Sequence, residues 1–172
     1  MHAITLSRLP AAAAAVVAAV GAATILGAYF FQYVVGLAPC PLCLDQRIAY
    51  YVSIPLAAVI AVAAGLGAPR RLLAAGLAVI ALAMLFNAGL ALFHAGVEWK
   101  WWEGPRECSG PLTDLGAGGD LLSSLQNISL VRCDEAAWRF LGLSLAGYDV
   151  LISLALAAVA VWGVRAALQK PL

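Results

Sequence analysis

Charged side chains are scarce in this sequence, since only 11% of its 172 residues are Asp, Glu, Lys or Arg. Soluble globular domains carry about 25% charged residues, so this composition excludes a soluble domain. The formal net charge is only +1, and we expect no nucleic acid among the partners. Apolar residues are abundant instead, at 64% of the chain with a mean hydropathy of +0.94. We therefore expect the chain to be surrounded by membrane lipid.

Histidine and closely spaced cysteine pairs are also scarce. The histidines are His2 and His94, and the cysteines are Cys40, Cys43, Cys108 and Cys133. A zinc site would need a second close cysteine pair or histidines at ligand spacing. Cys108 and Cys133 lie 25 positions apart, so the sequence predicts no metal site.

Four apolar runs are long enough, or nearly so, to form membrane-spanning helices, which need about 20 residues each. They cover about residues 11–35, 48–66, 72–93 and 146–165. We predict an all-α membrane protein, a four-transmembrane-helix bundle that forms a single integral membrane domain over residues 1–172.

The first run also resembles a secretory signal peptide, because Arg8 precedes an alanine-rich stretch. However, the apolar residues continue to Val35, well beyond the 7–15 residues of a signal core. We therefore interpret this run as a spanning helix.

Charge predicts the orientation of the bundle. One side holds bases and no carboxylate; these bases are Arg8, Arg70, Arg71, Arg165 and Lys170. They lie in short segments, where the positive-inside rule applies most strongly, so we expect both termini in the cytoplasm. The loops at about 36–47 and 94–145 then lie outside, and these loops hold all four cysteines.

The segment Pro39-Cys40-Pro41-Leu42-Cys43 indicates redox chemistry. At the start of a helix, unpaired N–H groups and the positive end of the macrodipole favour a thiolate, which is the nucleophile of disulfide exchange. With a helix beginning near Cys40, the side chains of Cys40, Cys43 and Arg47 share one face. Arg47 would then place a permanent cation beside the second thiol.

Simpler interpretations exist for these residues. Arg47 can extend to the membrane interface or pair with Asp45. The four cysteines can form two purely structural disulfides, as in many secreted loops. A disulfide across only two intervening residues closes a small ring, and such bonds tend to be labile and catalytic, which favours the redox interpretation.

Beyond the third run, the long loop resembles a membrane-surface segment. Apolar residues at helical spacing between 121 and 128 predict a short interfacial helix. His94 lies at the outer end of the third run, where it is either a proton donor near a bound electron acceptor or a structural residue. Asn87 is interpreted as an interhelical hydrogen-bonding residue.

These motifs resemble those of the bacterial disulfide bond formation protein B (DsbB) family over nearly the whole chain. The resemblance rests on three features in order: Pro-Cys-Pro-Leu-Cys-Leu-Asp-Gln-Arg at 39–47, a long loop with Cys108 and Cys133, and Arg-Cys-Asp-Glu-Ala-Ala-Trp-Arg-Phe-Leu-Gly-Leu at 132–143. It implies a quinone-dependent oxidoreductase of the bacterial inner membrane whose cysteines face the periplasm.

The resemblance also implies a mechanism. A reduced DsbA-like thioredoxin-fold protein of the periplasm would attack the Cys108–Cys133 disulfide at Cys108, and electrons would pass to Cys40 and Cys43. Cys43 would then reduce a bound quinone, either ubiquinone or menaquinone, beside Arg47 and His94. Gln46 stands at a position where other members can carry glutamate, so no essential role is assigned to it.

Two alternatives remain open at this stage. The vitamin K epoxide reductase-like family also relays thiol electrons to quinones through four helices. Its loop pair precedes the Cys-x-x-Cys motif, whereas Cys40 and Cys43 come first here. The second alternative is a membrane scaffold with structural disulfides, in which Arg47 beside the motif would have no purpose.

Overall fold

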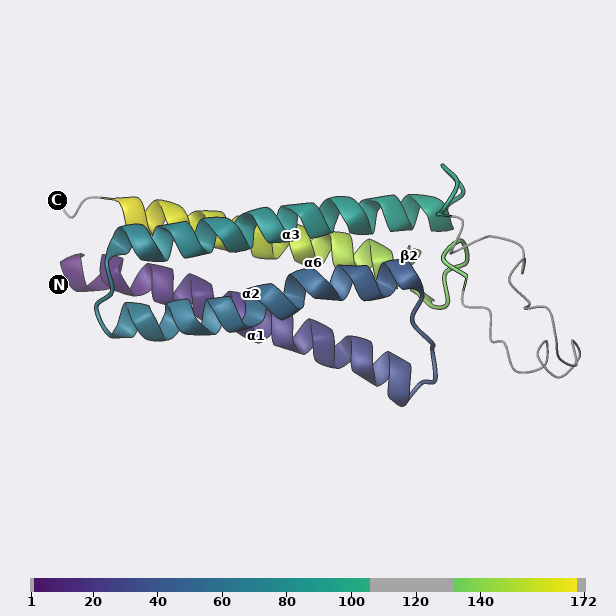
Figure 1. Ribbon diagram of the computed structural model, residues 1–172, viewed down its shortest axis with the longest axis horizontal. Coiled ribbons are helices and arrows are strands. Elements are labelled where there is room, and N and C mark those ends of the chain that lie inside the picture. The colour runs from purple at the N-terminus through teal and green to yellow at the C-terminus, as the bar shows by residue number, and fades with distance from the viewer. Residues whose placement is uncertain (1, 106–131, 170–172) are drawn as a thin grey trace, which may run out of the picture.

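The computed structural model describes residues 2–105 and 132–169 and consists mainly of four long helices (Figure 1). These are α1 (His2–Tyr33), α2 (Pro41–Gly65), α3 (Arg70–Glu98) and α6 (Leu145–Leu168). All four are long and apolar enough to cross a membrane, which confirms the predicted four-helix architecture. The predicted interfacial helix at 121–128 lies outside the described residues.

Two of the helices extend beyond the apolar runs in the sequence. α2 begins at Pro41, ahead of the run at 48, and α3 continues to Glu98, past the run that ends at 93. Hydropathy marks the part of a helix that suits lipid, and it does not mark where backbone hydrogen bonding stops. As a result, polar residues of the outer loops become part of rigid helices.

The helices pack most closely towards the end of the bundle that holds the termini. Leu77, Ile80 and Met84 of α3 are completely buried in a core shared with Val17 of α1. Gly163 of α6 lets the helices approach closely, because a Cβ atom there would lie 2.8 Å from the Cβ of Ala13. Towards the other end α1 diverges from α3 and α6, which stay side by side (Figure 1).

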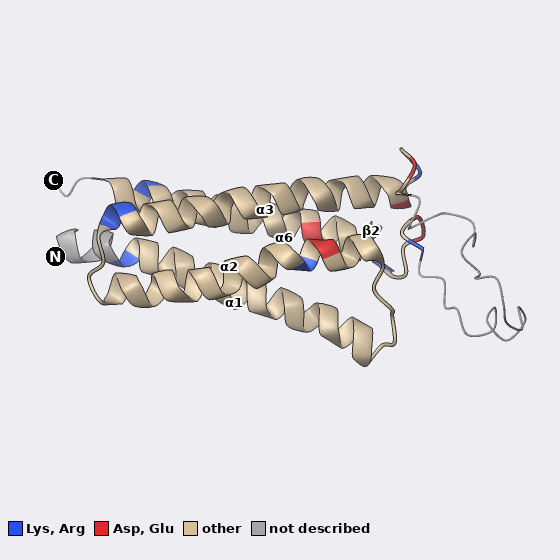
Figure 2. Ribbon diagram, viewed as in Figure 1, with Lys and Arg blue, Asp and Glu red and all other residues tan. Residues whose placement is uncertain are grey.

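The outside of the bundle is apolar. Large side chains such as Phe86 and Leu82 are 75% and 68% exposed, as suits a surface that faces lipid. Figure 2 shows Lys and Arg without Asp or Glu at the end of the bundle that holds both termini, whereas residues of both charges lie towards the other end. This distribution fits the predicted orientation, which stays a prediction.

A short hairpin that the sequence did not predict leads into α6. β1 (Arg139–Phe140) pairs antiparallel with β2 (Leu143–Ser144), with Arg139 opposite Ser144. The two-residue turn has positive φ at Leu141 and Gly142, as a type I′ turn requires. Ser144 then caps α6, since its Oγ accepts a hydrogen bond from the Gly147 N–H at 3.1 Å.

Candidate redox site

The Cys-x-x-Cys motif forms the N-terminus of α2. Cys40 is the N-cap residue, and its Sγ accepts a hydrogen bond from the Cys43 N–H at 3.2 Å. Pro41 occupies the first helical turn, where its missing N–H has no partner to lose. The Sγ atoms of Cys40 and Cys43 are 2.7 Å apart, and both residues are free thiols. The helix start therefore presents its unpaired N–H groups to a vicinal dithiol.

The second cysteine segment meets the first at Cys40. Cys133 is fully buried and packs in a small cluster with Cys40 and Leu42. The sulfurs of Cys40 and Cys133 and a ring nitrogen of His94 all lie within 4.8 Å of one another. Cys133 is disulfide-bonded, and Cys108 lies outside the described residues. The fold thus brings an oxidised sulfur of the long loop beside the thiol of Cys40.

The same three residues form a possible metal-ligand group that sequence spacing did not reveal. Metals bind the cysteine thiolate, and the disulfide-bonded Cys133 has none to offer in this state. The absence of a metal site stays a prediction from the sequence.

An ion cluster anchors the segment around Cys133 to the end of α3. Asp134 accepts hydrogen bonds from Arg132 at 2.9 and 2.8 Å and from Lys100 at 2.7 Å. The guanidinium of Arg132 and the ammonium of Lys100 hold the pKa of Asp134 well below its usual range. The neighbour of Cys133 is therefore charged and tethered at neutral pH.

His94 links the dithiol to a buried carboxylate. Gln46 donates a hydrogen bond to His94 Nδ1 at 2.8 Å, which places the ring proton on Nε2. His94 Nε2 lies 3.6 Å from Cys40 Sγ and 3.9 Å from a carboxylate oxygen of Glu98, which also accepts a hydrogen bond from Ser144. Gln46, to which the sequence assigned no essential role, therefore fixes the orientation and tautomer of His94.

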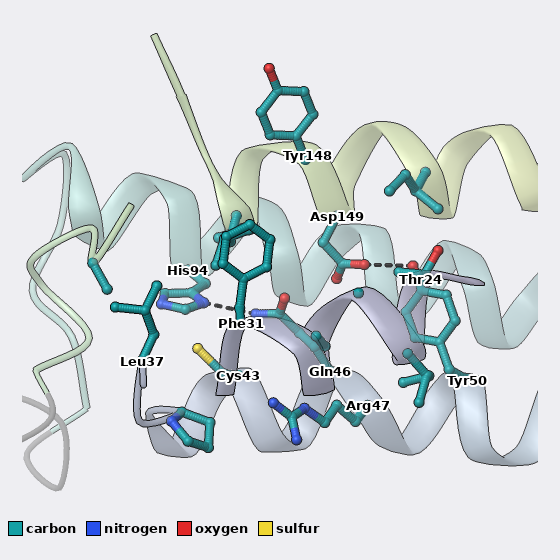
Figure 3. Close-up of a pocket in the computed structure, with 18 of the residues that line it drawn as sticks. Thr24, Phe31, Leu37, Cys43, Gln46, Arg47, Tyr50, His94, Tyr148 and Asp149 are labelled. Carbon is teal, nitrogen blue, oxygen red and sulfur yellow. Dashed lines mark hydrogen bonds between the residues drawn. The ribbon is translucent and has the colours of Figure 1, made fainter. Parts of the chain in front are cut away.

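A cavity of about 310 Å³ opens where α1 diverges from the other helices (Figure 3). Its walls come from α1, the loop after it, α2, α6, His94 of α3 and Ala137 ahead of β1, and they are mostly apolar. The polar side chains on these walls include Cys43, Gln46, Arg47, Tyr50, His94 and Asp149. Cys40 does not line the cavity, so the two thiols of the motif face different neighbours.

Arg47 is held at the edge of this cavity by α1. It is only 9% exposed, donates a hydrogen bond to Gln32 Oε1 at 2.8 Å, and lies 5.3 Å from the ring centroid of Tyr29. Within the described ranges it forms no ion pair with Asp45 or any other carboxylate. Its charge is therefore available to the cavity rather than used in a surface ion pair.

Asp149 is the cavity residue that sequence reasoning missed. The sequence places it at the outer mouth of the fourth run, among the acids of that side. In the structure it lies on the second turn of α6 and points into the cavity (Figure 3). Asn87 donates to it from α3 at 3.0 Å, which confirms the interhelical hydrogen bond predicted for Asn87. The signal in the sequence that could have identified Asp149 as a site residue was a carboxylate next to a long apolar run.

The surroundings of the two thiols predict unequal reactivity. The hydrogen bond with Cys43, followed by burial, raises the pKa of the Cys40 thiol. Cys40 therefore stays protonated at neutral pH, and its thiolate appears only well above the usual thiol pKa of about 8.5. When the fully reduced protein is treated with iodoacetamide at pH 7, we expect peptide mass spectrometry to find Cys43 modified long before Cys40.

Unfolding in detergent and denaturant is the control, because it should make the two cysteines react at similar rates. Equal rates in the folded protein would contradict the difference in environment.

Comparisons with known proteins point to a single family. A family model described as disulfide bond formation protein DsbB matches residues 10–163. The disulfide bond formation protein B of Aromatoleum aromaticum is 38% identical over 135 residues, covering 76% of each chain. That of Saccharophagus degradans is 32% identical over 149 residues (83% of this chain, 86% of the relative), and that of Verminephrobacter eiseniae 29% over 180 residues (96% and 94%). No solved structure matches the chain significantly.

Proposed function

Because the chain belongs to the DsbB family of disulfide-forming oxidoreductases, we propose that it is a membrane thiol:quinone oxidoreductase that reoxidises a DsbA-like periplasmic protein. The DsbA–DsbB–quinone pathway is known to keep the bacterial periplasm oxidising. The proposal places the four helices in the bacterial inner membrane, with both termini in the cytoplasm and the cysteines in the periplasm. The apolar outer surface and the basic end of the bundle support this placement (Figure 2).

In the proposed relay, a reduced thioredoxin-fold partner attacks Cys108 and reduces the loop disulfide. The sulfur of Cys133 then attacks Cys40 of an oxidised Cys40–Cys43 pair, which releases Cys43 as a thiolate. Cys108 in turn attacks Cys133, which re-forms the loop disulfide and releases Cys40, and the two protons of the loop thiols pass to Cys40 and Cys43. The observation that carries this order is the position of the two thiols: Cys40 lies within 4.8 Å of Cys133, whereas Cys43 lines the cavity. The free thiols of Cys40 and Cys43, with Cys133 oxidised, correspond to the stage at which the electrons have reached the cavity.

The cavity residues fit a quinone. The volume of the cavity, about 310 Å³, lies at the lower end of the range of volumes of small-molecule binding sites. The apolar walls of the cavity carry only a few polar groups. When bound, a quinone, whether ubiquinone or menaquinone, supplies a two-electron, two-proton acceptor. Cys43 would face it, Arg47 would stabilise negative charge that develops at Cys43 and at the acceptor, and His94 would offer a hydrogen bond.

The experiment that tests this function is quinone reduction by the protein purified in detergent. A reduced thioredoxin-fold dithiol protein serves as electron donor, and the loss of quinone absorbance is followed over time. We expect quinone to be consumed in equal amount to the donor disulfide formed. A folded protein that oxidises no donor and reduces no quinone would overturn the proposal and favour a scaffold with structural disulfides.

Arg47 provides a sharper test of the cavity. Replacing Arg47 by methionine keeps much of the apolar stem but removes the cation beside Cys43. Hydrogen bonds to charged groups contribute about 1.5–3 kcal/mol, so we expect quinone reduction to slow by about 10- to 100-fold. The rate of quinone reduction by Arg47→Lys should fall between those of wild type and Arg47→Met, because lysine restores the charge but not the planar guanidinium group.

The matched control is Arg165→Met, which makes the same change in α6 at the other end of the bundle. Steady-state assays at several quinone concentrations separate binding from turnover. If Arg47→Met behaves like Arg165→Met, Arg47 does not act on the reaction.

A further inference from the structure

A buried carboxylate lines the same cavity as Cys43. Asp149 lies within a membrane-spanning helix, where an ionisable residue is costly unless it serves a function. Figure 3 shows it extending from α6 towards the cavity, while Cys43, Gln46 and Arg47 extend from α2. No Lys or Arg of the described residues lies within ion-pair distance of Asp149. The charge of Asp149 is therefore stabilised by hydrogen bonds or neutralised by a proton, and not by a neighbouring cation.

Two other helices hold this carboxylate in place. The Tyr50 hydroxyl of α2 donates to Asp149 Oδ1 at 2.5 Å, and Asn87 of α3 donates to Oδ2 at 3.0 Å. Ser153, one turn along α6, lies 2.9 Å from Asn87 Nδ2 and 3.2 Å from the Tyr50 hydroxyl. Ser153 Oγ also donates to Asp149 Oδ1, at 3.5 Å. A carboxylate has about four acceptor positions, so these three donors still leave room for a proton or a ligand. Asp149 is therefore fixed in position without being fully occupied.

The proposed function needs protons as well as electrons in this cavity. Forming the Cys40–Cys43 disulfide breaks two S–H bonds, makes one S–S bond, and releases two electrons and two protons. Both electrons and both protons end on the two oxygens of the acceptor. Those oxygens lie at opposite ends of a quinone ring, and Figure 3 shows Cys43 and His94 towards one end of the cavity and Asp149 towards the other.

We propose that Asp149 is the proton donor on the far side of the cavity. It hands one proton to an oxygen of the bound quinone and recovers one of the two protons that the thiols release, so it is unchanged after each turnover. The second thiol proton reaches the acceptor from the side of Cys43 and His94. Tyr50 and Asn87 are positioning residues that hold Asp149. This inference rests on the proposed quinone reduction and assigns its second proton site.

Few other titratable groups can produce the same pH dependence. Tyr50 of α2 contacts Asp149 directly, and Cys43 and Arg47 of α2 and His94 of α3 line the same cavity. Loss of the Cys43 proton at high pH forms the nucleophilic thiolate, so it would raise the rate rather than lower it. Tyr148 precedes it on α6, and Figure 3 shows its ring directed away from the labelled residues of α2. α1 contributes no titratable side chain to the described lining of the cavity.

The test compares wild type with Asp149→Asn in the quinone reduction assay. Asparagine keeps the size and can accept from Tyr50, but it cannot carry a transferable proton. General acid catalysis contributes about 10²- to 10⁴-fold, so we expect kcat to fall by about 100-fold or more. The wild-type rate should decline as pH rises and Asp149 loses its proton, and this decline should vanish in Asp149→Asn. Ser53→Ala, one turn from Tyr50 on α2, is the matched control.

A second readout does not depend on turnover. Infrared difference spectra of the oxidised protein, recorded with and without quinone, should show a carboxylic-acid carbonyl band that is missing in Asp149→Asn. Quinone should raise the thermal unfolding midpoint of both proteins to a similar degree, since binding is retained. If the rate, pH profile and infrared band of Asp149→Asn match those of wild type, Asp149 has a structural role and the inference is wrong.

A variant that fails to fold does not block the test. Asp149→Glu keeps a carboxyl group, and it must keep the decline in rate at high pH; a flat profile would overturn the inference. Failure of the proposed function looks different, because wild type itself would then reduce no quinone.

Discussion

Replacing Cys43 by alanine is expected to abolish quinone reduction, with a loss of about three orders of magnitude or more. Cys43 is the cysteine of the motif that lines the cavity, whereas Cys40 is buried against His94 and Cys133. Without the Cys43 sulfur, α2 cannot form its disulfide, and no sulfur faces the bound acceptor. The measurement is the loss of quinone absorbance with a reduced thioredoxin-fold donor.

The control must show that Cys43→Ala is folded. Quinone binding to both proteins can be compared through the rise in the thermal unfolding midpoint that it produces. Ser53→Ala is a suitable companion, because Ser53 Oγ is the one buried side-chain oxygen or nitrogen without a partner in the described part of the chain. Removing it should be neutral or slightly stabilising and should leave turnover intact. A Cys43→Ala protein that still reduces quinone at the wild-type rate would refute the relay.

The four-helix architecture could be predicted from the sequence because lipid imposes a simple rule. A span needs a long run of apolar residues whatever its neighbours are, so hydropathy alone locates it. The N-cap position of Cys40 could also be anticipated, since proline before and after it favours a helix start. These features depend on local sequence, and the structure agrees with the sequence on both.

The organisation of the site depends on contacts between distant segments, which no local pattern encodes. Gln46 orients His94 from 48 positions away, and Asp149 meets Tyr50 across 99 positions. The sequence predicted one face for Cys40, Cys43 and Arg47 from helical spacing. Cys40 is an N-cap with extended backbone angles, so its sulfur turns towards His94 while Cys43 and Arg47 line the cavity. Because the backbone of Cys40 is not helical, the thiols of Cys40 and Cys43 have different neighbours.

Those separate environments lead to a prediction about which sulfurs can join. A variant that keeps only Cys40 and Cys133, made by Cys43→Ala and Cys108→Ala, is expected to form a disulfide between them in most molecules on mild oxidation. Their sulfurs already lie within 4.8 Å of each other in a buried cluster, so a side-chain rotation brings them to bonding geometry. Mass spectrometry of the digested, non-reduced protein identifies the cross-linked peptides.

The matched variant keeps Cys43 and Cys133 instead, through Cys40→Ala and Cys108→Ala. It has the same number of thiols and the same long-loop cysteine. Cys43 packs only at the edge of the cluster of Cys40 and Cys133, lines the cavity, and is not among the atoms that lie within 4.8 Å of one another. We expect little cross-link in it under the same conditions, because disulfide exchange requires direct access of one sulfur to the other. Equal yields in the two variants would show that the long loop reaches both thiols alike, and the order of the relay through Cys40 would then have no structural basis.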